Sequence, residues 1–104
     1  MKSKSSRVFI SNLGAHDYTK VKKYGELVPI TEGQVNIFHT DRLIANIKEK
    51  LLAENATRED FLLLSGNALV SSLVLHEWLK KFGKARLLIY NAVSRDYELR
   101  DIFD

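Results

Sequence analysis

FLLLSGNALVSSL, residues 61–73, is the stretch that best indicates the fold class of this chain of 104 residues. Phe61 to Leu64 form a continuous apolar run of strand length, which is typical of a strand buried on both faces of a sheet. Ser-Gly-Asn at residues 65–67 breaks the run, and the mostly apolar residues that follow predict a helix from Ala68 to Phe82. Gly83 is expected to end that helix as a C-cap.

The same alternation of strand and helix extends in both directions from this stretch. ARLLIY, residues 85–90, predicts another buried strand, and YELRDI, residues 97–102, alternates like the return arm of a hairpin. Upstream, residues 41–54 carry apolar side chains at helical spacing, and Thr40 and Asp41 are good N-caps for that helix.

The sequence of the N-terminal part of the domain predicts two more strands. Val8 to Ser11 is short and apolar, and Glu26 to Thr31 contains Pro29, which favours an edge strand. QVNIF, residues 34–38, is either a short strand or an extended connection. We therefore expect residues 1–6 to be a flexible basic arm and residues 7–104 to form one domain.

The predicted fold class is α/β. The order of elements indicates a small Rossmann-like domain with a mainly parallel sheet of four to five strands, two main helices and a C-terminal hairpin. Two helices are too few to cover both faces of such a sheet. The long loop after the first strand can cover part of the second face, and we infer that a second copy of the chain covers the remainder, as a homodimer.

Composition narrows the function. The sequence has no cysteine and three histidines far apart, so we expect no disulfide, no metal site and no cofactor. No apolar run approaches about 18 residues, so we expect no membrane association and a cytoplasmic protein. Residues 1–25 carry six basic residues against one acidic residue, which favours an anionic partner, although a solubilising role explains the excess equally well.

Two segments follow predicted strands at the edge of the sheet where ligands bind in open α/β folds. Ser65, Gly66 and Asn67 precede a helix, so their backbone and side chains can form an anion cradle. An ordinary strand-to-helix turn with Asn67 as N-cap is the alternative. The first loop adds Gly14 for a tight turn, His16 for proton transfer, and tyrosines and lysines for a base and phosphates.

The candidate ligand-binding residues are those of the two segments together: Asn12, Gly14, His16, Tyr18, Lys20, Lys22, Ser65, Gly66 and Asn67. No catalytic residue is assigned. If the protein is an enzyme, His16, Asp17 and Lys20 are the candidates, with His16 or Asp17 as the acid or base.

Residues 8–31 also resemble a known family. Leu13, Gly14 and Tyr18, followed by Tyr24 and a second strand, resemble the opening of CARF domains, the Rossmann-like sensors of CRISPR-linked effectors. Ala15 and His16 stand where that family has threonine and a second glycine. The resemblance implies a dimer that binds a cyclic oligonucleotide or similar nucleotide across its two-fold axis, with Gly14, His16, Tyr18 and residues 65–67 around the ligand.

Four functions are compatible with these patterns. The leading hypothesis is a small module that binds a nucleotide or another phosphoryl ligand, as a sensor or a sequestering protein. The second is a small phosphodiesterase or ring nuclease that uses the His16 and lysine loop. The third is an accessory protein that binds nucleic acid unspecifically through the basic arm, and the fourth is a protein-interaction module without a ligand.

Overall fold

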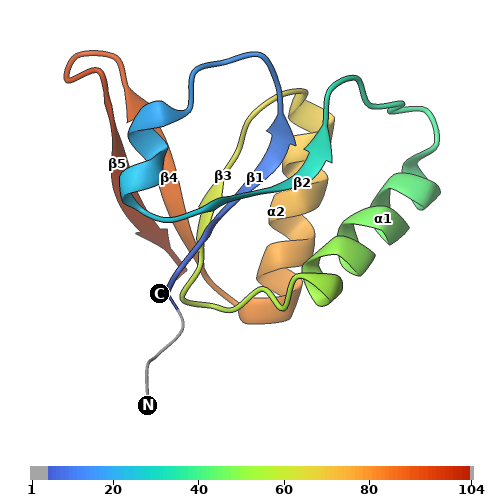
Figure 1. Cartoon of the computed structure of the whole chain (residues 1–104). Helices are drawn as coiled ribbons and strands as arrows, with labels where there is room; N and C mark the ends of the chain where they lie inside the picture. Colours follow the sequence, from blue (N-terminus) through green and yellow to red (C-terminus); the bar gives the residue numbers. More distant parts are fainter. Residues whose placement is uncertain (1–4, 104) are drawn as a thin grey trace.

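The computed structural model describes residues 5–103, and these residues form one five-stranded sheet with two helices (Figure 1). Residues 1–4, which are most of the predicted basic arm, and Asp104 lie outside the described part. The strands are β1 (Val8–Leu13), β2 (Leu27–Glu32), β3 (Phe61–Leu63), β4 (Ala85–Asn91) and β5 (Asp96–Ile102). The helices are α1 (Thr40–Ala53) and α2 (Ala68–Phe82), with a short 3₁₀ helix, η1 (Thr19–Lys23), between β1 and β2.

The strand order is β2-β1-β3-β4-β5, with the first four strands parallel and β5 antiparallel to β4. The predicted α/β class, the mainly parallel sheet and the C-terminal hairpin are confirmed. Pro29 lies on the edge strand β2 and is the register partner of Ile10 of β1. Proline has no amide hydrogen to donate to a neighbouring strand, so an edge strand is the place in a sheet where it is tolerated. The chain moves outward from β1 to β2 and then back across to β3, so the strand order reverses between β1 and β3.

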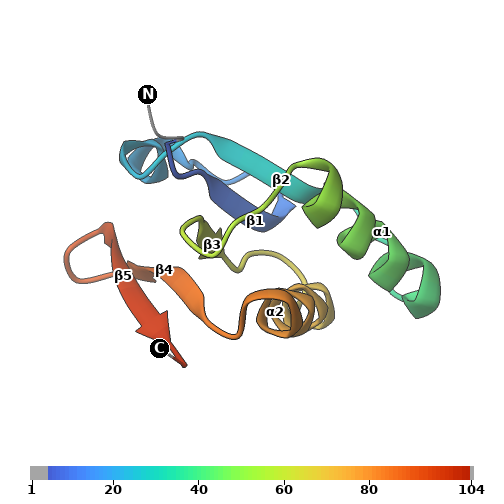
Figure 2. The same ribbon diagram turned by 90° about the horizontal axis from the view of Figure 1, so that it is seen from below.

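This reversal decides which face each connection covers. Because parallel connections are right-handed, a connection that runs one way along the sheet lies on the opposite face from one that runs the other way. Figure 2 shows α1 and α2 together on one face, and the segment containing η1 on the other. The prediction that the first loop covers part of the second face is therefore confirmed.

Each face of the sheet has its own core. On the helix face, Phe9, Leu62 and Trp78 are fully buried, and the rings of Phe9 and Trp78 lie 5.5 Å apart. On the other face, Val21 of η1 and Tyr18 pack with the strand residues Val8, Ile10, Phe61, Leu63 and Leu88. β3 contributes buried side chains to both cores, as its continuous apolar sequence predicted.

Some element boundaries differ from the sequence prediction. Residues 34–38 form no strand; they are a connection that contains a bend at Gln34 and a turn at residues 37–38. The cap of α1 was predicted wrongly: Thr40 and Asp41 lie inside the first turn, and His39 occupies the N-cap position without a side-chain hydrogen bond. By contrast, α2 has the predicted bounds, with Gly83 in the left-handed conformation at its C-cap (φ 77°). Neither helix of the described chain has the length and apolar character needed to cross a membrane.

The amino-terminal edge of the sheet is fastened by a buried carboxylate. Asp60, 1% exposed, accepts hydrogen bonds from the Arg7 amide (2.9 Å), the Thr57 amide (2.8 Å) and the Thr57 hydroxyl (3.2 Å). The Arg7 guanidinium lies 3.8 Å from the same carboxylate and also pairs with Glu54 at 3.3 Å. One aspartate thus joins the start of β1 to the turn before β3.

Replacing Asp60 by alanine should lower the free energy of unfolding by about 3 kcal/mol, because the buried donors and the partly buried Arg7 lose their acceptor. Urea denaturation measures the change. Asp101→Ala is the matched control, since this carboxylate is half-exposed and makes one contact of 3.8 Å with Arg86. The control should change stability by no more than about 0.5 kcal/mol, and equal losses in the two variants would contradict the assignment.

Candidate functional site

The carboxyl-terminal edge of the sheet contains a gap where β3 stops early. β3 is three residues long and pairs with β4 at Phe61–Arg86 and Leu62–Leu87, yet β4 continues to Asn91. On its other side β3 pairs with β1 as far as Ile10–Leu63, whereas β1 continues to Leu13. We refer to the space between β1 and β4 beyond Leu63 as the notch.

A buried serine holds the chain where it leaves β3. Ser11 of β1 is fully buried, and its hydroxyl accepts from the Ser65 amide (2.7 Å) and donates to the Ser65 carbonyl (2.6 Å). The Ser71 hydroxyl of α2 also donates to that carbonyl at 3.3 Å. The side chain of Ser11 thereby replaces the strand pairing that ends at Leu63, and it directs the chain away from β4 toward α2.

Tyr18 brings the first loop to the same place. Its ring is buried in the core on the η1 face, and its hydroxyl accepts from the Gly14 amide (3.3 Å) and lies 3.3 Å from the Ser65 hydroxyl. The rings of His16 and Tyr18 meet edge to face, with centroids 6.2 Å apart. The loop after β1 and the turn after β3 therefore lie together at one edge of the sheet.

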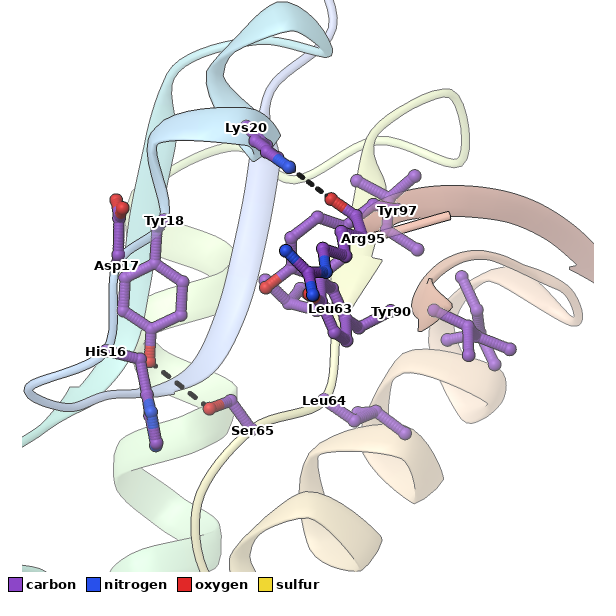
Figure 3. A pocket seen from close by; sticks show the side chains of 13 residues that line it. His16, Asp17, Tyr18, Lys20, Leu63, Leu64, Ser65, Tyr90, Arg95 and Tyr97 are labelled. Atoms are coloured by element: carbon purple, nitrogen blue, oxygen red, sulfur yellow. Dashed lines mark hydrogen bonds between the residues drawn. The ribbon is translucent and has the colours of Figure 1, made fainter. Parts of the chain in front are cut away.

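A cavity of about 730 Å³ occupies the notch and extends beneath the β4–β5 hairpin; we name it the notch pocket. Its volume is within the range usual for small-molecule sites. Figure 3 shows the Tyr18–Ser65 and Lys20–Arg95 contacts on different sides of it. The lining combines apolar side chains with aromatic and basic ones: His16, Asp17, Tyr18, Lys20, Leu63, Leu64, Ser65, Leu87, Leu88, Ile89, Tyr90, Arg95 and Tyr97.

The charges around the notch pocket favour an anion. Lys20 donates to the Arg95 main-chain carbonyl, a neutral acceptor, and its charge also acts on the carboxylates of Asp17 and Asp96 without forming an ion pair with either. Within residues 5–103, no carboxylate forms an ion pair with Lys20 or Arg95. Asp17 is the one acidic residue of the lining, and its carboxylate accepts from both the amide and the hydroxyl of Thr19 (2.9 and 2.5 Å). These bonds lower the pKa of Asp17 below its usual value.

The β4–β5 hairpin contributes two aromatic side chains to the pocket. Tyr90 and Tyr97 are register partners on β4 and β5, and their rings meet edge to face at 5.3 Å. Burial raises the pKa of Tyr97 above the usual value of a phenol, which is itself well above neutral pH, so the hydroxyl is protonated at neutral pH. A protonated phenol can donate a hydrogen bond to a ligand.

The structure brings only part of the predicted site to this cavity. His16, Tyr18, Lys20 and Ser65 line it, as does Asp17 from the alternative catalytic set. The other candidates lie outside the lining: Asn12, Gly14, Lys22, Gly66 and Asn67. Lys22 is exposed on η1, and Lys23 forms an ion pair with Asp96 that raises the pKa of the lysine and lowers that of the aspartate.

The turn at residues 65–67 has the geometry of an ordinary strand-to-helix connection. Asn67 is the N-cap of α2, and its side chain accepts from the Leu69 amide at 2.8 Å. Gly66 has a φ of +91°, and a Cβ there would lie 2.8 Å from the Cβ of Asn12. Asn12 itself is held by hydrogen bonds with Thr31 and the Gly33 carbonyl. A side chain at position 66 would therefore meet Asn12.

Sequence reasoning missed the contribution of the hairpin. Arg95, Tyr90 and Tyr97 reach the pocket because β4 is seven residues long and β3 only three, so the hairpin extends past the end of its neighbour. The apolar run at residues 85–90 is longer than the run at residues 61–64, and this difference in the sequence could have indicated that the hairpin extends past its neighbour. In the described chain, no three histidine, aspartate or glutamate side chains are placed to hold a metal ion.

Residues 6–102 match the family described as phage Pam3 gp32-like protein. The chain belongs to the phage Pam3 gp32-like family. Neither the curated proteins nor the solved structures include a significant match.

The resemblance of residues 8–31 to CARF domains is therefore wrong, because the family match spans nearly the whole chain and no CARF family matches. The residues that carried the resemblance have local structural roles in this family member. Tyr18 packs in the core and bonds to the Gly14 amide, a pairing that explains both residues without a cyclic oligonucleotide.

Gly66→Ala should destabilise the protein by more than the 1–2 kcal/mol that a left-handed conformation costs a residue with a side chain, because Asn12 must also move. Gly33→Ala is the matched control: its φ is +64°, and nothing lies within 4 Å of the added carbon. Thermal and urea denaturation compare the two. A smaller loss for Gly66→Ala than for Gly33→Ala would show that Asn12 does not constrain this turn.

Proposed function

We propose that the protein is a Rossmann-like module of the cytoplasm that binds a nucleotide or another small phosphoryl ligand in the notch pocket, as a sensor or a sequestering protein. The observation that supports this best is the composition of one cavity: leucines and tyrosines, among them the buried Leu63, Leu88 and Tyr18, beside Lys20 and Arg95, neither in an ion pair with a carboxylate within residues 5–103. A nucleotide has the matching parts, a flat apolar ring and an anionic group.

The position of the cavity supports the same proposal. Ligands of open α/β sheets bind outside the carboxyl ends of the strands, near the point where the strand order reverses. Here the order reverses between β1 and β3, and the notch pocket begins where β3 ends. The loop after β1 lines its other side through His16, Tyr18 and Lys20.

We favour binding over catalysis because the acidic candidate is already engaged. The Asp17 carboxylate accepts two hydrogen bonds from Thr19, and its lowered pKa makes it a weak base at neutral pH. His16 contacts Tyr18 through its ring and has no carboxylate partner to orient it within the described chain. A hydrolytic role would therefore depend on His16 and Lys20 without the help of Asp17 as a base.

Lys20→Gln should weaken the binding of a nucleoside monophosphate at least about tenfold, since one charge-assisted hydrogen bond contributes about 1.5–3 kcal/mol. Lys22→Gln is the control: it makes the same change of charge in η1, outside the pocket lining. Isothermal titration calorimetry measures both, after a thermal-shift screen of nucleoside mono-, di- and triphosphates, because a ligand of the native state raises its melting temperature.

The Lys22 variant should bind within about twofold of the wild type, and both variants should melt close to it, as surface substitutions usually do. Equal weakening by the two substitutions would mean that the lysines act only through net charge. No stabilisation by any nucleotide in the screen would overturn the proposed function.

We also predict a homodimer. Residues 14–25 cover much of the face opposite the helices, so the area left for a partner on that face lies over the hairpin strands, where Tyr90 is about half exposed. Sedimentation velocity at micromolar concentration should give a dimer with an interface on the order of 1,200–2,000 Å². A monomer at these concentrations would show that residues 14–25 complete the second face alone.

A further inference from the structure

The direction of the main chain in β3 determines which groups of β4 face the notch. The Phe61 amide donates to the Arg7 carbonyl at 2.8 Å, so Phe61 directs its main-chain groups toward β1. Successive residues of a strand alternate, and Leu62 therefore directs its groups toward β4. In a parallel pair a residue bonds to the two neighbours of its register partner, and the partner of Leu62 is Leu87.

Arg86 and Leu88 consequently direct their main-chain groups toward β3, and by the same alternation so does Tyr90. The pairing of β3 with β4 ends at Leu87, and Leu64 belongs to no strand. The Leu88 carbonyl and both main-chain groups of Tyr90 thus face the notch at the side where no strand continues. Leu88 and Tyr90 are also lining residues of the notch pocket, so these groups are presented to its contents.

We infer that this inner edge of β4 recognises the base of the bound nucleotide through main-chain hydrogen bonds; the inference rests on the proposed function and adds the class of base. The Leu88 carbonyl is an acceptor, and the Tyr90 amide, two residues on, is a donor on the same side. This pair matches an amino group next to an unprotonated ring nitrogen. Adenine and cytosine carry that arrangement, whereas uracil has no amino group.

The remaining lining fits this orientation of the ligand. Leu63 and Leu88 are buried and provide an apolar surface, and Tyr90 and Tyr97 line the same pocket with their rings in contact. Lys20 and Arg95 meet at the hairpin turn, where they can hold the phosphate. A peptide strand fits less well, because Leu64 and the fastened Ser65 close the inner end of the notch to a chain passing through it.

The first arm of the test uses the wild-type protein. Isothermal titration calorimetry compares adenosine and cytidine monophosphates with uridine monophosphate, and the better binder of the first two with its analogue carrying a dimethylated amino group. Loss of one hydrogen bond to the edge of β4 should weaken binding about tenfold for uridine monophosphate and for the dimethylated analogue.

The second arm removes the main-chain donor. Tyr90→Pro eliminates the Tyr90 amide hydrogen on the side of β4 that faces away from β5, where proline is tolerated. Tyr90→Ala removes the same side chain and keeps the amide, so the difference between the two variants isolates the main-chain group. The proline variant should bind about tenfold more weakly than the alanine variant and have similar far-ultraviolet circular dichroism.

The outcomes separate this inference from the proposed function. Equal affinity for the parent nucleotide and its dimethylated analogue overturns base recognition by β4, whatever the variants do. If binding in that case still depends on Lys20 and not on Lys22, the phosphoryl-binding function stands without it. Absence of binding by all the nucleotides overturns both.

Discussion

The pairing of the Ser11 hydroxyl with both main-chain groups of Ser65 is the interaction on which the candidate site depends. Burying two backbone polar groups without partners would cost several kcal/mol, so a chain that leaves a sheet inside the protein needs a replacement for the lost pairing. Ser11 provides it within 2.7 Å on each side. Because both hydrogen bonds hold Ser65 toward β1, the main chain after Leu63 separates from β4, and the notch forms on the β4 side.

The two edges of the sheet differ in how far their polar groups are paired within the protein. At the amino edge the hydrogen-bonding groups of Asp60 are used within the protein, together with Arg7 and Thr57. At the carboxyl edge Lys20 and Arg95 have no carboxylate partner among the described residues, and the inner edge of β4 has no neighbouring strand. A ligand that supplies an anion and a hydrogen-bonding edge would complete what the fold leaves incomplete there.

The sequence predicted best what local interactions determine. The bounds of α2 follow from Asn67 and Gly83, each of which acts on its own few neighbours. Capping of α1 by Thr40 or Asp41 was wrong because the helix begins one residue earlier than the strongest capping residues suggest. Arg95 and Tyr97 were not foreseen, since their place in the pocket depends on hairpin register and on how far β4 outlasts β3, which are properties of the assembled sheet. The close approach of Asn12 to Gly66 joins residues far apart in the sequence, so local patterns did not indicate it.

The loop after β1 combines many aromatic, basic and other polar residues because it has two structural roles. Residues 14–25 must cover the face that no α-helix reaches, and Tyr18 and Val21 do so by packing on β1 and β3. The same segment forms one wall of the notch pocket, to which it contributes His16 and Lys20. Tyr18 serves both tasks, because its ring is in the core and its hydroxyl bonds at the rim. A loop with these constraints must combine apolar, aromatic and basic residues in a short length, whether or not each one contacts the ligand.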